Sequence, residues 1–126
     1  TTESIATTFL STSALFGGMA IYGMTTKKDL TSMGNFLYMG LMGIIISSII
    51  NIFVGSSIMQ MAISAIGVII FTGLTAYDTQ KILQMYQSGD VYSETGTKKA
   101  ILGALVLFLD FINLFIFLLR FLGNRR

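Results

Sequence analysis

The chain has 126 residues, of which 53% are hydrophobic and only 11% are charged, and its mean hydropathy is +0.76. Soluble domains carry about 25% charged residues, so this composition predicts one membrane-embedded domain over residues 1–126. The absence of Cys and His excludes disulfides, thiolate or histidine metal sites and a Ser-His-Asp triad. Basic residues stand at the ends of apolar runs and the formal charge is only +2, which argues against nucleic-acid binding.

Four apolar segments follow one another along the chain, so the sequence predicts an all-α, polytopic membrane helix bundle. We expect the helices at residues 5–26, 33–54, 57–86 and 100–122. Each is long enough to cross a hydrocarbon core of roughly 30 Å, which makes the lipid bilayer the first expected partner. The chain opens with Thr rather than Met and shows no signal-peptide pattern, so we expect it to be part of a longer protein.

The first two segments each carry a stripe of small and polar residues at helical spacing. The stripes are Thr7, Ser11, Ala14, Gly18 and Tyr22 in the first segment, and Gly43, Ser47 and Asn51 in the second. Small residues let helices approach closely in lipid, so we expect the first stripe to pack against another helix, with pathway lining as the alternative. We expect Asn51 to face protein, because its amide needs hydrogen-bond partners.

The connections between segments predict the topology. The connection after Val54 is very short, so the second and third helices should be antiparallel neighbours. If all four segments cross, five basic residues share one side, which is predicted to be cytoplasmic. These are Lys27, Lys28, Lys81, Lys98 and Lys99, against Arg120, Arg125 and Arg126 on the other side. A fourth segment that enters and returns would place all eight on one side and remains an alternative.

Two aspartates stand out in the last two segments. Asp110 is the eleventh of twenty residues in the run 100–119, so a spanning helix holds it near the bilayer midplane. A carboxylate there costs at least a few kcal/mol unless it is protonated, paired or wetted. In the third segment, Asp78 shares one helix face with three hydroxyl residues, Thr72, Thr75 and Thr79. Lys81 falls off this face and is expected to reach the interface.

We expect the polar faces of the third and fourth helices to turn toward each other. Two carboxylates that meet in a low dielectric cannot both ionise cheaply, so the pair is expected to share a proton. Loss of that proton would leave two charges that repel or recruit a cation, and oxygen ligands suit transient Ca²⁺ binding by Asp78 and Asp110. The threonines and Asn113 are candidate pathway-lining residues. Alternatively, Asp78 lies in headgroup water and Asp110 makes an assembly hydrogen bond.

The depths of the two aspartates conflict with this pairing. Asp78 lies at the end of its apolar run, whereas Asp110 lies in the middle of its own, so straight helices separate them by roughly 10–15 Å in depth. Either the third helix continues to about residue 86, or the fourth starts nearer the interface.

Three blocks of the sequence resemble the transmembrane Bax inhibitor motif family. They are TTKKDLTSMG at residues 25–34, FTGLTAYDTQKI at residues 71–82 and LDFINLF at residues 109–115. The resemblance covers the whole chain and has a bacterial character. Because members of this family have seven helices, it implies that this chain corresponds to the last four and that three N-terminal helices are missing partners.

The resemblance also implies a function and a location. It implies a pH-sensitive calcium leak without enzymatic turnover or cofactor, in which aspartates matching Asp78 and Asp110 form the sensor and gate. It implies a bacterial inner membrane, or an endoplasmic reticulum or Golgi-type membrane in a eukaryote.

Two other functions fit parts of the sequence. An intramembrane aspartyl protease also uses two membrane aspartates that share a proton. Such enzymes carry Gly-x-Gly-Asp and Pro-Ala-Leu elements, but here LFLD ends at Asp110 and the chain contains no proline. A modulator of a protease or apoptotic membrane protein would use helix contacts instead. In that case the stripe Gly43, Ser47 and Asn51 should matter more than the aspartates.

Overall fold

The computed structural model describes residues 2–87 and 94–124, and the regular structure within these ranges is entirely helical. The helices are α1 (Thr2–Thr25), α2 (Thr31–Val54), α3 (Ser57–Gln87) and α4 (Glu94–Asn124). All four are long and apolar enough to cross a membrane. The predicted all-α membrane bundle is therefore confirmed.

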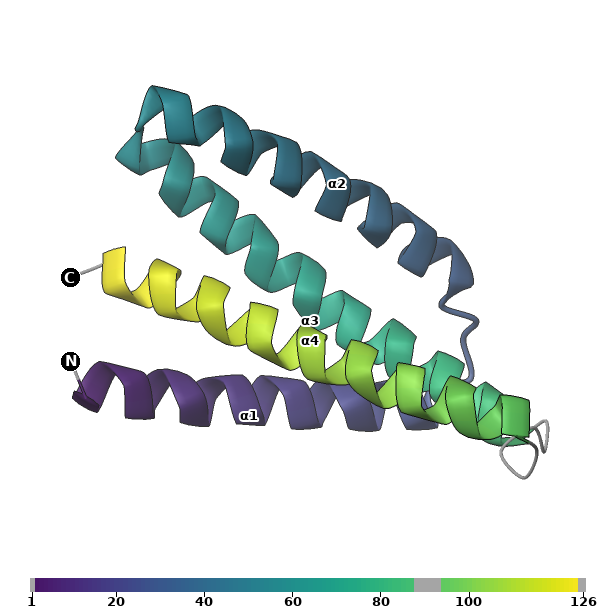
Figure 1. Cartoon of the computed structure of the whole chain (residues 1–126). Coiled ribbons are helices and arrows are strands. Elements are labelled where there is room, and N and C mark those ends of the chain that lie inside the picture. The colour runs from purple at the N-terminus through teal and green to yellow at the C-terminus, as the bar shows by residue number, and fades with distance from the viewer. Residues whose placement is uncertain (1, 88–93, 125–126) are drawn as a thin grey trace.

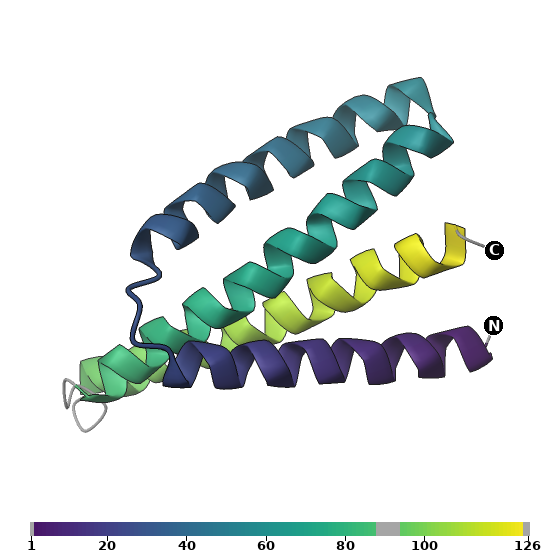
Figure 2. The same cartoon turned by 180° about the vertical axis from the view of Figure 1, so that it is seen from behind.

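Helix α3 is the centre of the bundle (Figure 1). It packs against each of the other three helices, α1 also packs against α4, and within the described residues α2 packs against α3 alone. Helices α1, α3 and α4 converge at the end that carries the α1–α2 and α3–α4 connections, whereas α2 is joined to α3 by a tight turn at the opposite end, which carries both termini (Figures 1 and 2). We call these the loop end and the far end.

The turn between α2 and α3 shows why these two helices are antiparallel neighbours, as predicted. Gly55 has φ +70°, a left-handed conformation that favours glycine, and its N–H donates to the Asn51 carbonyl at 2.7 Å. The Asn51 side chain adds a second bond, because its Oδ1 accepts from the Ser56 N–H at 3.0 Å. Asn51 thus finds a partner within the turn itself.

Helix α4 differs most from its expected bounds. It begins at Glu94 rather than at residue 100 and continues unbroken to Asn124. The added turn includes Lys98 and Lys99, which are exposed, so the helix extends past its apolar run into the polar residues before it. Because α4 ends at the far end, it crosses the bundle and does not return (Figure 1). The predicted polar loop at 88–93 and Arg125–Arg126 lie outside the described residues.

The interface between α1 and α3 is tightly packed. A Cβ on Gly23 would lie 2.3 Å from the Ala76 carbonyl oxygen, so only glycine allows this approach. Thr8 and Thr12 are buried on the same helix, and each donates its hydroxyl to the carbonyl four residues earlier at 2.7 Å. Polar side chains can therefore be buried here without any partner on another helix.

The predicted stripe of α1 is not the face that packs on α3 and α4. Of the predicted stripe, Thr7, Ala14, Gly18 and Tyr22 are exposed and Ser11 is half-buried. Thr8, Thr12 and Gly23 are buried instead, about 100° around the helix. Neighbouring positions carry similar small or hydroxyl residues, and the aromatic contacts of Phe9 and Phe16 with Phe111 set the rotation of α1 against α4, with ring centroids 5.9 and 5.3 Å apart.

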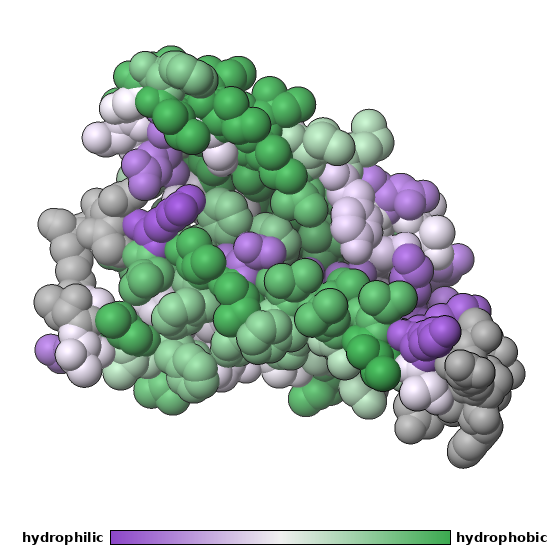
Figure 3. Space-filling view, viewed as in Figure 1, coloured by the Kyte–Doolittle hydropathy of each residue, from purple (hydrophilic) through white to green (hydrophobic). Residues whose placement is uncertain are grey.

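The surface of the bundle is apolar and its interior is partly polar. Phe53 and Ile58 are 86% and 84% exposed, whereas Asp78 and Asp110 are 4% and 5% exposed. Hydrophobic side chains cover most of the face in Figure 3, and hydrophilic residues interrupt them between α2 and α4 and at the loop end. This distribution is the one expected of a protein surrounded by lipid and other membrane helices.

Candidate functional site

The loop-end half of α3 positions the first aspartate. Residues 74–80 are all buried, which is unusual for a helix whose preceding turns alternate between buried and exposed residues. Three helices surround this stretch, with Gly23 of α1 against Ala76 and Gly34 of α2 against the Tyr77 ring. Asp78 is thereby held in the interior of the bundle rather than in headgroup water.

Helix α4 brings the second aspartate to the same place. A Cβ on Gly103 would lie 2.8 Å from Ile82, and a Cβ on Gly67 would lie 2.6 Å from the Phe117 ring, which fixes the antiparallel register of α3 and α4. In this register Asp78 and Asp110 are about one helical turn apart along the pair, roughly 5 Å. The expected conflict in depth disappears, because α3 runs on to Gln87 and α4 begins at Glu94.

In this register the two buried carboxyl groups are neighbours in the bundle interior, close enough to interact electrostatically. A hydrogen bond between two carboxyl groups needs a proton on one of them. Oδ2 of Asp78 and Oδ2 of Asp110 are buried and have no hydrogen-bond partner among the described residues. Buried carboxyl oxygens normally have donors, so the described residues leave this pair unsatisfied.

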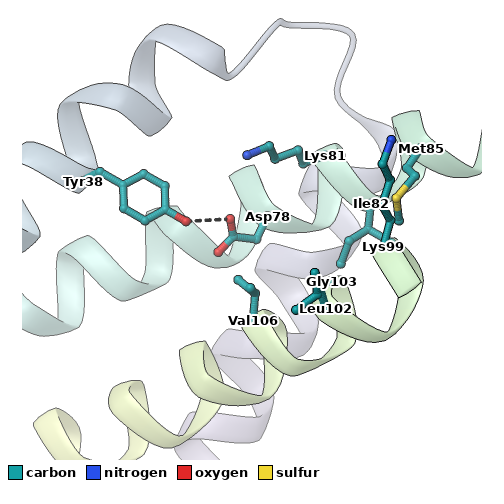
Figure 4. A pocket seen from close by; sticks show the side chains of 9 residues that line it. All are labelled: Tyr38, Asp78, Lys81, Ile82, Met85, Lys99, Leu102, Gly103 and Val106. Atoms are coloured by element: carbon teal, nitrogen blue, oxygen red, sulfur yellow. Dashed lines mark hydrogen bonds between the residues drawn. The ribbon is translucent and has the colours of Figure 1, made fainter. Parts of the chain in front are cut away.

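A tyrosine that the sequence did not single out completes this cluster. The Tyr38 hydroxyl of α2 donates to Asp78 Oδ1 at 3.1 Å (Figure 4). The Tyr38 ring lies edge-on to Tyr77, with centroids 6.0 Å apart. Tyrosine near a helix end usually indicates the membrane interface, so no pattern in α2 distinguished this residue. Only the packing of α2 on α3 reveals its contact with Asp78.

Three hollows line the groove between α2 and α4. The loop-end hollow, about 300 Å³, is bordered by Asp78, Lys81 and Lys99 (Figure 4). The central hollow, about 540 Å³, is bordered by Asp110 and Asn113. The far-end hollow, about 330 Å³, is bordered by polar residues from three helices, namely Ser48, Asn51, Gln60, Ser64 and Arg120. We call the three together the α2–α4 groove.

Of the other predicted pathway residues, one borders a hollow and three do not. Asn113 borders the central hollow together with Asp110. The threonines border none of the three hollows, and each donates its hydroxyl to the carbonyl four residues earlier, at 2.6 to 2.8 Å; they are Thr72, Thr75 and Thr79. Their hydroxyls therefore find hydrogen-bond acceptors in the backbone of their own helix, as those of Thr8 and Thr12 do.

Two residues that follow Asp78 within one helical turn, Gln80 and Lys81, make contacts close to the site. Lys81 is exposed, as expected, and its Nζ lies 5.4 Å from the centroid of the Tyr77 ring. Gln80, which sequence reasoning missed, ties the α1–α2 connection to α3. Its Oε1 accepts from the Leu30 N–H at 3.0 Å and its Nε2 donates to the Lys28 carbonyl at 2.7 Å. A buried glutamine between an aspartate and a lysine carried no signal of this role.

The cluster offers oxygen ligands but few of them. Two carboxylates and one phenol oxygen suit a hard cation such as Ca²⁺, which usually takes six to eight oxygens. No group of three or more acidic, His or Cys side chains that could hold a metal ion occurs in residues 2–87 and 94–124. The described residues therefore supply fewer oxygen ligands than a bound Ca²⁺ usually takes.

Comparison with known proteins places the chain in a family. All of residues 1–126 match the family described as inhibitor of apoptosis-promoting Bax1. An uncharacterised protein of Rickettsia prowazekii is 54% identical over 127 residues, and the inner membrane protein YbhL of Escherichia coli is 51% identical over 127 residues. An uncharacterised protein of Borreliella burgdorferi is 52% identical over 126 residues.

These relatives are longer than the chain. The alignments cover 100% of this chain but only 53% of the Rickettsia protein and 54% of the other two, so the chain spans about half the length of the relatives it matches. The E. coli relative and the four apolar helices together support an integral inner-membrane location. The predicted family is confirmed, and the chain belongs to the Bax inhibitor family of membrane proteins.

Proposed function

We propose that the chain forms part of a pH-sensitive leak for calcium or similar cations, in which Asp78 and Asp110 are the proton-sharing sensor and gate. The observation that carries this proposal is the proximity of two buried carboxyl groups on α3 and α4 whose Oδ2 atoms have no hydrogen-bond partner in the described part of the chain. With one shared proton the pair carries a single negative charge. When that proton leaves, the two like charges repel or bind a cation.

The groove supports transport rather than tight binding. Asp78 borders the loop-end hollow and Asp110 the central hollow, so the pair lies where a cation would pass from one to the other. Lys81 and Lys99 border the loop-end hollow and raise the positive potential there, which opposes cation entry at close range, while salt screens their charge at distances beyond about 8 Å. The proposal includes no enzymatic turnover and no cofactor.

The direct test is calcium flux. The full-length protein would be reconstituted in liposomes that contain a calcium indicator, and the initial rate of entry recorded between about pH 5 and 8. We expect a rate above that of empty liposomes with a single pH midpoint. A rate that equals that of empty liposomes at every pH would refute the proposal.

A second function is favoured by one observation. The stripe Gly43, Ser47 and Asn51 has an open face, since no atom outside its own helix lies within 4 Å of a Cβ built on Gly43. Such a face suits close contact with another membrane helix, as in a modulator of a membrane protease or of an apoptotic protein. That function predicts that Gly43→Leu abolishes activity in cells while Asp78→Asn and Asp110→Asn preserve it. A leak predicts the reverse for the aspartates.

A further inference from the structure

The border between the loop-end hollow and the central hollow is formed by very few side chains. Tyr38 and Val106 border both hollows, whereas Asp78 borders only the first and Asp110 only the second. The aspartate pair therefore straddles this border, with one carboxyl group on each side. Tyr38 is the one side chain of α2 that reaches both hollows.

The contacts of Tyr38 hold it across this border. Its hydroxyl donates to Asp78 Oδ1 at 3.1 Å, and its ring lies against the Tyr77 ring. One turn earlier, Gly34 lets α2 approach α3, since a Cβ there would lie 2.4 Å from the Tyr77 ring. In Figure 4 the Tyr38 ring extends from α2 toward α3, and its hydroxyl points at the Asp78 carboxyl group.

The Tyr38 ring moves with α2, which is the least constrained of the four helices. Within the described residues it packs against α3 alone, whereas α1, α3 and α4 pack against one another. Beyond Tyr38 the central hollow separates α2 from α4, so a small rotation of α2 about α3 meets little resistance from α4. The hydrogen bond to Asp78 links this less constrained helix to the aspartate pair.

We propose that Tyr38 is the partition between the two hollows and sets what passes between them: its ring blocks the connection, and its hydroxyl bond to Asp78 keeps the ring in place. This inference rests on the proposed function, because it takes the α2–α4 groove as the ion pathway. It assigns a specificity-determining role to a residue outside the aspartate pair. A smaller side chain at this position should admit larger solutes.

Site-directed labelling tests the partition without measuring ion flux. The chain contains no cysteine, so a single Asn113→Cys change reports on the central hollow, once any cysteine elsewhere in the full-length protein is replaced. A membrane-impermeant thiol reagent is added from the loop-end side of the bilayer. We expect Tyr38→Ala to raise the labelling rate at residue 113 at least tenfold and Tyr38→Phe to raise it less. Tyr38→Trp should lower it.

Three controls separate opening of the partition from unfolding. Leu102→Cys, in the loop-end hollow, should label at the same rate in every background. Leu114→Cys, at a fully buried position, should stay protected in every background. Tyr22→Ala removes an exposed tyrosine of α1 that borders none of the three hollows and should leave labelling at residue 113 unchanged.

The outcomes separate this inference from the proposed function. If Leu102→Cys labels and Tyr38→Ala leaves the rate at residue 113 unchanged, Tyr38 is not the partition, even if calcium flux remains pH-dependent. If Tyr38→Ala raises and Tyr38→Trp lowers the rate, the partition stands as a physical barrier, even if no calcium flux is found.

Discussion

The two sides of α3 handle polar groups in opposite ways. On the α1 side, the backbones approach so closely that only Gly23 fits against Ala76, and the buried threonines donate to their own helix. On the other side, hollows separate α2 from α4, and two buried carboxyl oxygens lack donors from elsewhere in the described residues. Close packing with satisfied polar groups is typical of a structural interface, whereas buried groups left unsatisfied are typical of a functional site.

One side of α3 is open, because hollows separate α2 from α4 there. The largest effect should come from removing the part of the full-length protein that covers this open side. The chain spans about half of its relatives' length, so we expect the rest of the protein to contribute helices that complete the α2–α4 groove. Residues 1–126 alone, reconstituted and shown by circular dichroism to be helical, should give no pH-dependent calcium flux. A robust leak from this segment would show that the groove works without further helices.

The packed side is most sensitive at Gly23. Because the nearest atoms belong to the Ala76 backbone, Gly23→Ala should force the two helices apart and cost roughly 3 kcal/mol, at the upper end of overpacking effects. Gly18→Ala is the matched control, since no atom beyond its own helix backbone lies within 4 Å of a Cβ there. Equal unfolding free energies for the two variants, measured by denaturant titration in micelles, would refute the close contact.

The loop end depends on Gln80, which bonds to two backbone groups of the α1–α2 connection. Gln80→Ala should destabilise the bundle by about 2 kcal/mol, because a buried N–H and a carbonyl lose their partners. Gln80→Glu keeps the acceptor for Leu30 but puts a buried carboxyl oxygen against the Lys28 carbonyl, so it should destabilise the bundle at least as much at neutral pH. The same denaturant titration measures both, and no change for Gln80→Ala would mean that water replaces these bonds.

The smallest effect is expected for Asp29, an exposed residue in the connection just before α2. The Thr31 hydroxyl and then the Thr31 backbone N–H hold the pKa of Asp29 below its usual value. A lowered pKa stabilises the fold above the unfolded value of about 3.9, and this stabilisation is lost as the pH falls through the folded value. Asp29→Ala should therefore lower the Tm slightly at pH 7 and not at all well below pH 3. A deficit that persists in acid would point to a cause other than the carboxylate.

The packed and open sides also differ in how far sequence predicts them. Hydropathy predicted the four helices, and the polar faces around Asp78 and Asp110 predicted that these helices meet there. Sequence did not predict which face of α1 packs on α3 and α4, because Thr7 and Thr8 look alike and only the Phe9 and Phe16 contacts with Phe111 decide which one is buried there.

Other features depend on contacts that no local pattern carries. The start of α4 at Glu94 was missed, because hydropathy marks the apolar run and not the helix that extends beyond it. Tyr38 and Gln80 were missed because their partners lie 40 to 52 residues away in the sequence.

The central claim is that the two aspartates of the open side titrate as one unit, and one flux measurement in the full-length protein tests it directly. Asp78→Asn, Asp110→Asn and the double variant keep side-chain size but remove titration, and Asn113→Ala, beside Asp110 in the central hollow, is the control. Each single change should abolish the pH dependence of calcium flux, and the double change should add little, because groups that act together are not additive. Asn113→Ala should alter the rate but not the pH midpoint. If both single aspartate variants kept the wild-type midpoint, the shared-proton account would be contradicted, and both residues would have structural roles.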